Sequence, residues 1–201
     1  MTALAFSEHG SIFEWWHKKQ DVEAAGMKYI HAIEAYVTES IKNGKVRDNY
    51  HCILIARNYE GFKEINQLSS NSFNREDGHF YYVPRITMDE LVNTSDNIII
   101  TTACLGGILH NGTDAIKQRF VDFLESNSDR CFLEIQHHIE EEQIKYNRRL
   151  VELSREIHVP LIAGTDTHAL NEAHLEARAV LQRSKRVHFE NEDAWGFEFK
   201  S

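Results

Sequence analysis

The chain has 201 residues, of which 42% are hydrophobic, so it is long and apolar enough to bury the core of one domain. Its 22 Lys and Arg residues against 31 Asp and Glu residues give a net charge of −9, which argues against a nonspecific nucleic-acid clamp with a basic face. Its three cysteines, without a Cys-x-x-Cys pair, argue against a disulfide framework and favour a reducing cytoplasm.

Segments with strand and helix periodicity alternate along the chain. The first part predicts strands at residues 3–6, 27–37 and 51–57 and helices at residues 11–25 and 59–72. Thr87 and Glu90 form the Thr-x-x-Glu pattern of a capping box, which predicts a short helix that ends at Val92. The rest predicts strands at residues 98–102, 131–136 and 161–163, helices at 113–126, 140–157 and 171–182, and a polar tail after Ser184.

This alternation predicts a mostly parallel sheet in a single domain over residues 1–201. No Gly-x-Gly-x-x-Gly occurs, so a barrel is favoured over a dinucleotide-binding fold. In such barrels the catalytic residues lie where strands end and loops begin. No apolar run approaches the roughly 18 residues that cross a bilayer, and the first residues carry no basic leader, so no membrane contact is expected.

Asp166 and His168 directly follow a short apolar run and stand one residue apart. In an extended chain both side chains would point the same way. A carboxylate and an imidazole that converge at a strand end are typical ligands of a divalent metal, although the chain has 12 histidines and a lone pair also arises by chance. Four more residues with ligand chemistry lie in or beside apolar runs: His9, Glu34, His51 and Cys104.

His51 is the least regular member of this set, because it precedes its apolar run instead of following it. In a simple parallel strand it would lie at the wrong end of the barrel. Either its strand runs in the opposite direction or a bend leads into it. His79 is the alternative candidate for the same role.

Several segments occur in an order that resembles a known family. They are 3–10 (ALAFSEHG), 25–30 (AGMKYI), 33–37 (IEAYV), 51–58 (HCILIARN), 80–86 (FYYVPRI), 102–107 (TACLGG), 133–136 (LEIQ) and 165–170 (TDTHAL). The resemblance extends over nearly the whole chain. In this order the chain resembles the polymerase-and-histidinol-phosphatase (PHP) domain of the bacterial DNA polymerase III alpha subunit.

The resemblance implies a distorted (β/α)7 TIM-like barrel that holds up to three divalent metals, either manganese or zinc, with magnesium as a further option. The metal ligands that it implies are His9, Glu34, His51, Cys104, Asp166 and His168, with Glu34 bridging two metals. Glu8 stands where the family usually has Asp. His138 matches a histidine common in its loop, but it is not included among the expected ligands.

The chain departs from the family in one important respect, because it has no His-x-His motif after an opening strand. We therefore expect a barrel that lacks its first strand and three of the family's nine ligands. In family terms, Glu34, His51 and Cys104 remain for one metal. Glu34 and Asp166 remain for a second metal, and His9 and His168 remain for a third. A protein site usually needs three ligands to hold a catalytic metal, so we expect a weak hydrolase or no hydrolase activity.

The activity implied by the resemblance is metal-dependent phosphoester hydrolysis of the 3′–5′ exonuclease type, within a replicative polymerase in the cytoplasm. DNA and other replisome subunits would be the partners. His9, Asp166 and His168 are the expected catalytic residues, and Arg85 is a candidate contact for substrate phosphate. Two alternatives remain: a non-catalytic scaffold that stabilises the polymerase or docks a proofreading subunit, and a free-standing phosphatase.

Other residues are expected to be structural. Phe13, Trp15 and Trp16 are predicted to lie in the core or an interface. Cys52 and Cys131 are predicted to be small buried hydrophobic residues. The face of Lys145, Arg148 and Arg149 is predicted to be solvated.

Overall fold

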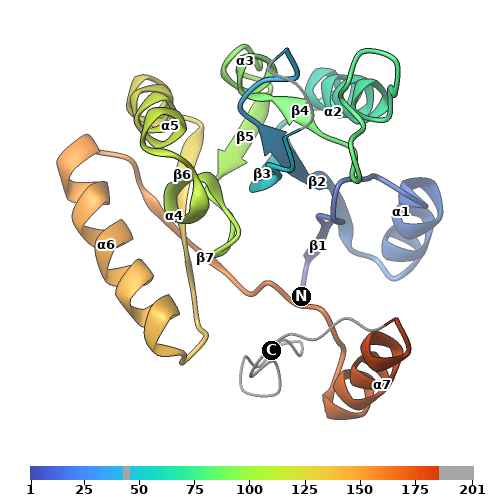
Figure 1. Cartoon of the computed structure of the whole chain (residues 1–201). Helices are drawn as coiled ribbons and strands as arrows, with labels where there is room; N and C mark the ends of the chain where they lie inside the picture. Colours follow the sequence, from blue (N-terminus) through green and yellow to red (C-terminus); the bar gives the residue numbers. More distant parts are fainter. Residues whose placement is uncertain (43–45, 186–201) are drawn as a thin grey trace.

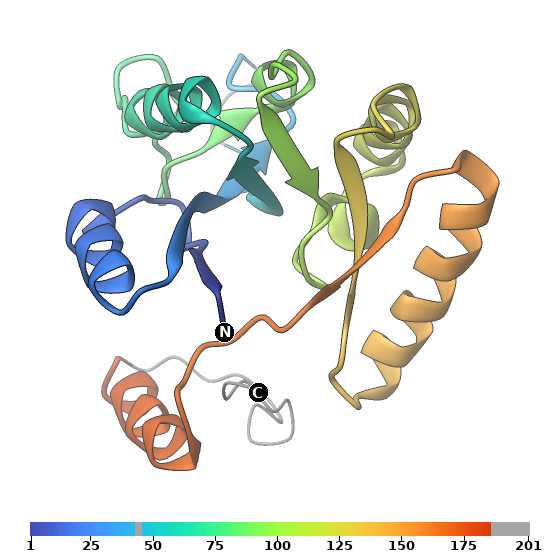
Figure 2. The ribbon, with the colours of Figure 1, turned by 180° about the vertical axis from the view of Figure 1, so that it is seen from behind.

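Seven strands form one curled sheet in the order β1-β2-β3-β5-β6-β7, with β4 beside β2. The structure, a computed structural model, describes residues 1–42 and 46–185. Figures 1 and 2 show the strong curl of the sheet. The strands are β1 Ala3–Phe6, β2 Lys28–Thr38, β3 Tyr50–Ala56, β4 Ile86–Thr87, β5 Ile98–Thr101, β6 Cys131–Gln136 and β7 Leu161–Gly164.

Helices follow most of the strands, and α1, α2, α3, α5 and α6 lie on the outer side of the curl (Figures 1 and 2). They are α1 Trp15–Ala24, α2 Tyr59–Ser72, α3 Met88–Val92, α4 Ile108–Asn111, α5 Asp114–Ser126, α6 Glu141–Ile157 and α7 Glu172–Ser184. This arrangement confirms the predicted α/β class with a distorted TIM-like barrel. In the described part of the chain, β1 and β7 do not pair with each other, so the barrel is open between them.

Strand direction is uniform with one exception. β1 and β4 are parallel to β2, and β6 is parallel to both β5 and β7. β3 is antiparallel to its two neighbours, β2 and β5. The first residue of β3 therefore lies at the edge of the sheet where β2 and β5 end.

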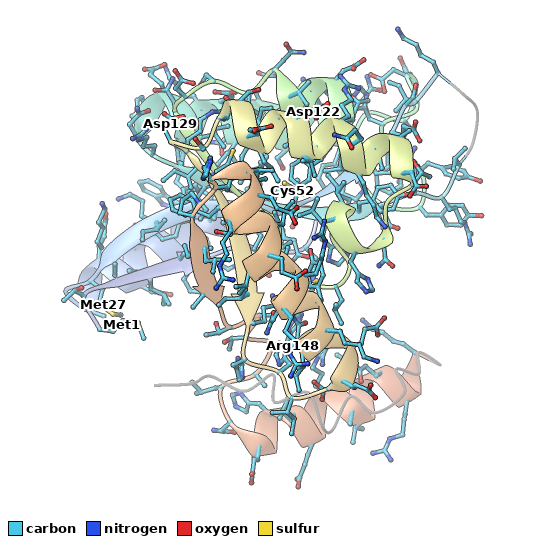
Figure 3. All side chains as sticks on the ribbon, turned by 90° about the vertical axis from the view of Figure 1, so that its left-hand side faces the viewer. Met1, Met27, Cys52, Asp122, Asp129 and Arg148 are labelled. Atoms are coloured by element: carbon cyan, nitrogen blue, oxygen red, sulfur yellow. The ribbon has the colours of Figure 1, made fainter. Side chains whose placement is uncertain are left out.

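The core lies between the sheet and its outer helices. Leu54, Ile100 and Leu133 from the strands are fully buried, as are Ile65 of α2 and Phe120 of α5. Figure 3 shows Cys52 in the interior and Asp122, Asp129 and Arg148 on the outside. The predicted burial of Cys52 and Cys131 and the predicted solvated face of α6 are confirmed.

Most predicted elements differ from the structure by one or two residues. The capping box of Thr87 and Glu90 is present and begins α3. α1 begins at Trp15 instead of residue 11, because Glu14 adopts a left-handed φ of 58° that interrupts the helix. Phe13 and Trp16 are 72% and 52% exposed, so of the two predicted places, core or interface, the core is wrong for both, and the interface stays a prediction.

Other elements were not expected from the sequence. The short helix α4 and the two-residue strand β4 were not predicted. The polar tail predicted after Ser184 lies almost wholly outside the described residues. Among the described helices, none is both long and apolar enough to cross a membrane.

Arg130 ties the start of β6 to the turn before β5. It is 2% exposed, and its guanidinium donates to the carbonyl oxygens of Thr94, Ser95 and Ile98 at 3.0–3.2 Å. A buried carbonyl that loses its donor costs about 1–3 kcal/mol. The Arg130 side chain therefore supplies these backbone carbonyl oxygens with hydrogen-bond donors that apolar side chains lack.

We predict that Arg130→Met lowers the free energy of unfolding by about 3 kcal/mol, because the carbonyl oxygens of Thr94 and Ile98 lose their donor and Ser95 O keeps only the Ile98 N–H. Urea unfolding measures the change. Arg119→Met is the control: Arg119 forms an exposed ion pair with Asp89, and its loss should cost less than about 1 kcal/mol. Equal losses in the two variants would contradict the assignment.

His31 gives the fold a dependence on pH. It is 5% exposed, and its Nε2 and Nδ1 atoms lie 2.9 Å from Asn66 Oδ1 and 3.0 Å from the Tyr29 hydroxyl. Burial lowers the pKa of His31 below its usual value, although the hydrogen bond to Asn66 opposes this. The unfolded chain therefore takes up this proton at a higher pH than the folded chain does.

We predict that His31 stabilises the fold fully above about pH 6.5, the pKa of an unfolded histidine, and that this stabilisation is lost as the pH falls toward the folded pKa. Between about pH 7 and pH 5, the free energy of unfolding should therefore fall more steeply in the wild type than in His31→Gln. Urea unfolding across this range tests it, and identical slopes would refute it.

Candidate metal centre

Glu34, His51 and Cys104 bring a carboxylate, an imidazole and a thiol together. One ligand atom from each lies within 4.8 Å of the other two. Cys104 Sγ is 3.4 Å from His51 Nδ1, and the same nitrogen lies against Glu34 Oε1. Within residues 1–42 and 46–185, this is the one group of three or more His, Cys, Asp or Glu residues with this geometry.

The reversed direction of β3 places His51 in this group. His51 pairs with Tyr36 across the antiparallel ladder, and its backbone N–H donates to Gly106 O at 3.0 Å. The first residues of β3 thus meet the loop that follows β5. Of the two explanations for a histidine that precedes its apolar run, the reversed strand is correct.

His79, the alternative candidate, belongs to another part of the molecule. Its ring lies between Asp77 Oδ1 at 2.8 Å and Glu90 Oε2 at 3.0 Å. It therefore buttresses the start of α3, and the alternative is wrong.

The loop after β5 is shaped around the His51 ring. Ala103 has a left-handed φ of 56°, which turns the chain so that Cys104 faces His51. A Cβ atom on Gly106 would lie 2.8 Å from His51 Nδ1, so only glycine fits there without a shift. The Gly106 N–H also approaches Cys104 Sγ at 3.4 Å.

Two further imidazoles border the cluster. His9 forms an isolated parallel bridge with Glu34, and its Nε2 lies 3.5 Å from Glu34 Oε2. The ring centroid of His9 is 5.9 Å from that of His51 and 5.1 Å from that of His168. His9 therefore connects Glu34 and His51 to the segment that follows β7.

Asp166 and His168 lie on one side of that segment. Both are half-buried, whereas Thr165 and Thr167 between and beside them are exposed. His168 Nδ1 lies 2.7 Å from the Asp166 carbonyl oxygen and 3.6 Å from its Oδ1. Asp166 has a φ of 47°, a conformation that Asp tolerates better than most residues.

Burial and neighbouring charges shift the pKa values of Asp166, Glu34 and Cys104. Burial raises the pKa of Asp166; the His168 imidazole opposes the rise and the Glu34 carboxylate adds to it. Burial also tends to raise the pKa of Glu34, but His51, His9 and His168 outweigh it, so this pKa lies below its usual value. The pKa of Cys104 is well above its usual range because of burial and the nearby Asp166 and Glu34 charges.

Glu134 of β6 is a buried carboxylate near the cluster that the sequence analysis missed. It accepts hydrogen bonds from Thr101 Oγ1 at 2.5 Å and Gln136 Nε2 at 3.0 Å. Burial raises its pKa, and the charges of Asp166 and Glu34 act in the same direction. The available signal was a glutamate in the middle of an otherwise apolar strand, which is costly unless it serves the site.

Arg85 does not occupy the site. It is 2% exposed, and its guanidinium donates to the carbonyl oxygens of Val46 at 2.7 Å and Gly78 at 2.9 Å and pairs with Asp48. The predicted phosphate contact is therefore replaced by a structural role, because the donors are already engaged inside the protein.

Two other residues from the family comparison also have clear positions. Glu8 forms an ion pair with Lys18 at 2.5 Å, outside the cluster. His138 is buried, and its charge lowers the pKa of Asp166, so it lies beside the cluster.

A family model described as the PHP domain matches residues 1–138 of the chain. The chain is 35% identical to DNA polymerase III subunit alpha of Borreliella burgdorferi over 191 residues, which cover 90% of this chain and 16% of that protein. It is 31% identical to the subunit of Aquifex aeolicus, with 92% and 17% covered, and 30% identical to that of Thermus aquaticus, with 97% and 17% covered. The chain thus spans about a sixth of these relatives.

A solved structure has the same fold. It is a proposed metal-dependent phosphoesterase from Bifidobacterium adolescentis, with a TM-score of 0.53 and 10% sequence identity. The match covers 82% of this chain and 76% of that chain. At this identity the match supports the fold alone.

We predict that Cys104→Ala and Glu34→Gln each weaken zinc binding at least about tenfold, the smallest loss expected even for an outer partner of a ligand. Cys131→Ala is the matched control, because it removes a buried thiol outside the cluster. Competition with a chromogenic chelator measures the affinity. Unchanged affinity in both cluster variants would show that the metal binds elsewhere.

Proposed function

Because the chain belongs to the PHP domain family, we propose that it is the PHP module of a bacterial or phage replicative DNA polymerase III alpha subunit and that its metal centre hydrolyses phosphoesters. The observation that carries the proposal is the convergence of Glu34, His51 and Cys104 beside His9, Asp166 and His168. The similarity to polymerase alpha subunits supports the replicative setting.

The donor set fits a divalent metal of intermediate softness. A thiolate and an imidazole favour zinc, and carboxylate oxygens also suit manganese and magnesium. Glu34, His51 and Cys104 would hold one ion, Asp166 with Glu34 a second, and His9 with His168 a third. Ions bound there would lower the pKa of a water molecule, orient the scissile phosphate and neutralise the leaving oxygen.

Side chains of the site would donate a proton to the leaving oxygen and hold the imidazoles in a fixed orientation. His9 is the most accessible of the three imidazoles in the site, with a side chain 45% exposed against 22% for His51 and 20% for His168, so it is the better placed to give a proton to a leaving oxygen. His168 receives a fixed orientation from the Asp166 carbonyl oxygen at 2.7 Å. Asp166 and Glu134 add negative charge that strengthens cation binding when they are ionised.

The substrate in this proposal is a DNA 3′ end, and the reaction is of the 3′–5′ exonuclease type. The partners are DNA, reached through the polymerase, and other replisome subunits. A cytoplasmic location is part of this proposal, and the similarity to polymerase subunits supports it.

A second candidate function is a non-catalytic scaffold that stabilises the polymerase or docks a proofreading subunit. It is favoured by one observation, namely that among the described residues only one group supplies three ligand atoms within 4.8 Å. A single ion there would stabilise the fold because the unfolded chain does not hold it. Nothing in the structure favours the free-standing phosphatase.

We predict manganese- or zinc-dependent release of nucleotides from a single-stranded DNA with a labelled 3′ end, and a fall of at least about a hundredfold in Asp166→Asn. The physical reason is the loss of one of the few carboxylates that face the site. Asp122→Asn is the control, because Asp122 lies on the outside of α5 (Figure 3).

The outcomes separate the two functions. Release that is slow but metal-dependent and lost in Asp166→Asn supports hydrolysis. Metal binding that raises the melting temperature without any release supports the scaffold. Release that persists in Asp166→Asn would refute the assignment of the site.

A further inference from the structure

A hollow of about 500 Å³ lies beside the metal centre. Its lining includes Arg47 and Asp48 of the loop before β3, Tyr50 and His51 at the start of β3, Gly106 of the loop after β5 and Asn111 of α4. His51 belongs both to this hollow and to the metal cluster. A molecule in the hollow therefore borders the metal centre directly.

Arg47 forms the cationic wall of the hollow. Its side chain is exposed, and its Cζ atom lies 3.3 Å from the centroid of the Tyr82 ring. At this separation the guanidinium stacks on the ring. A stacked guanidinium keeps its N–H donors at its edge, which is the geometry that binds a phosphate with two hydrogen bonds.

Arg85 fixes the backbone on both sides of Arg47. Its Nη1 atom donates to Val46 O at 2.7 Å and to Asp48 O and Oδ1 at 3.3 and 3.1 Å. The Asp48 carboxylate also accepts from Thr38 Oγ1 at 2.6 Å. Asp48 also lines the hollow, but its carboxylate is already paired with Arg85 and accepts from Thr38, so Arg47 remains as an exposed cation of an acidic chain.

Tyr82 is held out in an unfavourable conformation. It is 63% exposed, with a left-handed φ of 64°, at the tip of a tight turn closed by the bridge between Tyr81 and Val83. This conformation costs a non-glycine residue roughly 1–2 kcal/mol. The rings of Tyr81 and Tyr82 pack at an angle of 78° with their centroids 4.7 Å apart, so the exposed Tyr82 ring is preorganised.

We infer that Arg47 and Tyr82 form a binding site for one nucleotide of single-stranded DNA beside the metal centre. The Arg47 guanidinium takes the phosphate, the Tyr82 ring stacks on the base, and the hollow next to His51 receives the sugar and the neighbouring phosphate. Single-stranded nucleic acid is recognised by this combination of a cation and an aromatic platform. The choice of DNA as the ligand rests on the function proposed above.

Arg47 lies close enough to the metal centre for this role. It stands four positions before His51, which is at most about 14 Å of extended backbone, and the long Arg side chain can shorten this distance. A single-stranded DNA molecule that binds Arg47 through one nucleotide can therefore present an adjacent phosphate to the residues around His51.

Binding of a fluorescein-labelled oligothymidylate to the full chain, measured by anisotropy in the presence of a chelator, tests the inference. We expect Arg47→Ala and Tyr82→Ala each to weaken binding at least about fivefold, and Tyr82→Phe to retain it. The slope of log K against log salt should fall by about 0.7 in Arg47→Ala and stay constant in Tyr82→Ala, because only Arg47 contacts a phosphate.

Arg75→Ala is the matched control. Arg75 also lies over an aromatic ring, with its Cζ atom 4.3 Å from the centroid of Phe80, but it does not line the hollow. Its loss should leave the affinity unchanged. Equal weakening in Arg75→Ala and Arg47→Ala would show that binding depends only on the total charge of the protein, which would overturn the inference. An unchanged affinity in both Arg47→Ala and Tyr82→Ala would also overturn it.

This assay is independent of the proposed hydrolysis, because it contains no metal. Failure of metal-dependent nucleotide release with intact, Arg47-dependent binding would reject the catalytic proposal alone. If nucleotide release is metal-dependent but the affinity for the oligothymidylate is the same in Arg47→Ala, Tyr82→Ala and the wild type, only the inferred nucleotide site is rejected.

Discussion

The antiparallel placement of β3 between β2 and β5 is the constraint on which the rest of the site depends. If β3 ran parallel to its neighbours, His51 would lie at the other end of a seven-residue strand, about 20 Å away. Glu34 and Cys104 would then lack their third ligand, and the Gly106 loop would have no ring to pack around. The reversal also turns the preceding loop, with Arg47 and Asp48, toward the same edge of the sheet.

Several acidic groups are buried close together in the site, and ionising them there costs free energy. Burial raises the pKa of Asp166, Glu134 and Cys104. Neighbouring imidazoles oppose the rise at Asp166, and hydrogen bonds oppose it at Glu134 and Cys104. A divalent cation would remove the cost, because it stabilises the carboxylates and the thiolate together. Stability, metal affinity and protonation are therefore linked at this edge of the sheet.

Three arginines illustrate how position changes the role of one residue type. Arg130 and Arg85 are buried, and their donors satisfy carbonyl oxygens of turns. Arg47 is exposed on the loop that Arg85 fixes, and it stacks on Tyr82. The buried Arg85 thus fixes the loop on which the exposed Arg47 is presented.

The sequence by itself determined the alternation of strands and helices, the α3 capping box and the ligand-type residues, because these depend on local periodicity and side-chain chemistry. It could not determine the direction of β3, since the apolar run in β3 reads the same either way. It also could not separate Arg85 from Arg47, or find Glu134, because burial depends on residues far along the chain. Only the tertiary structure decided these points, since strand pairing and packing bring the distant residues together.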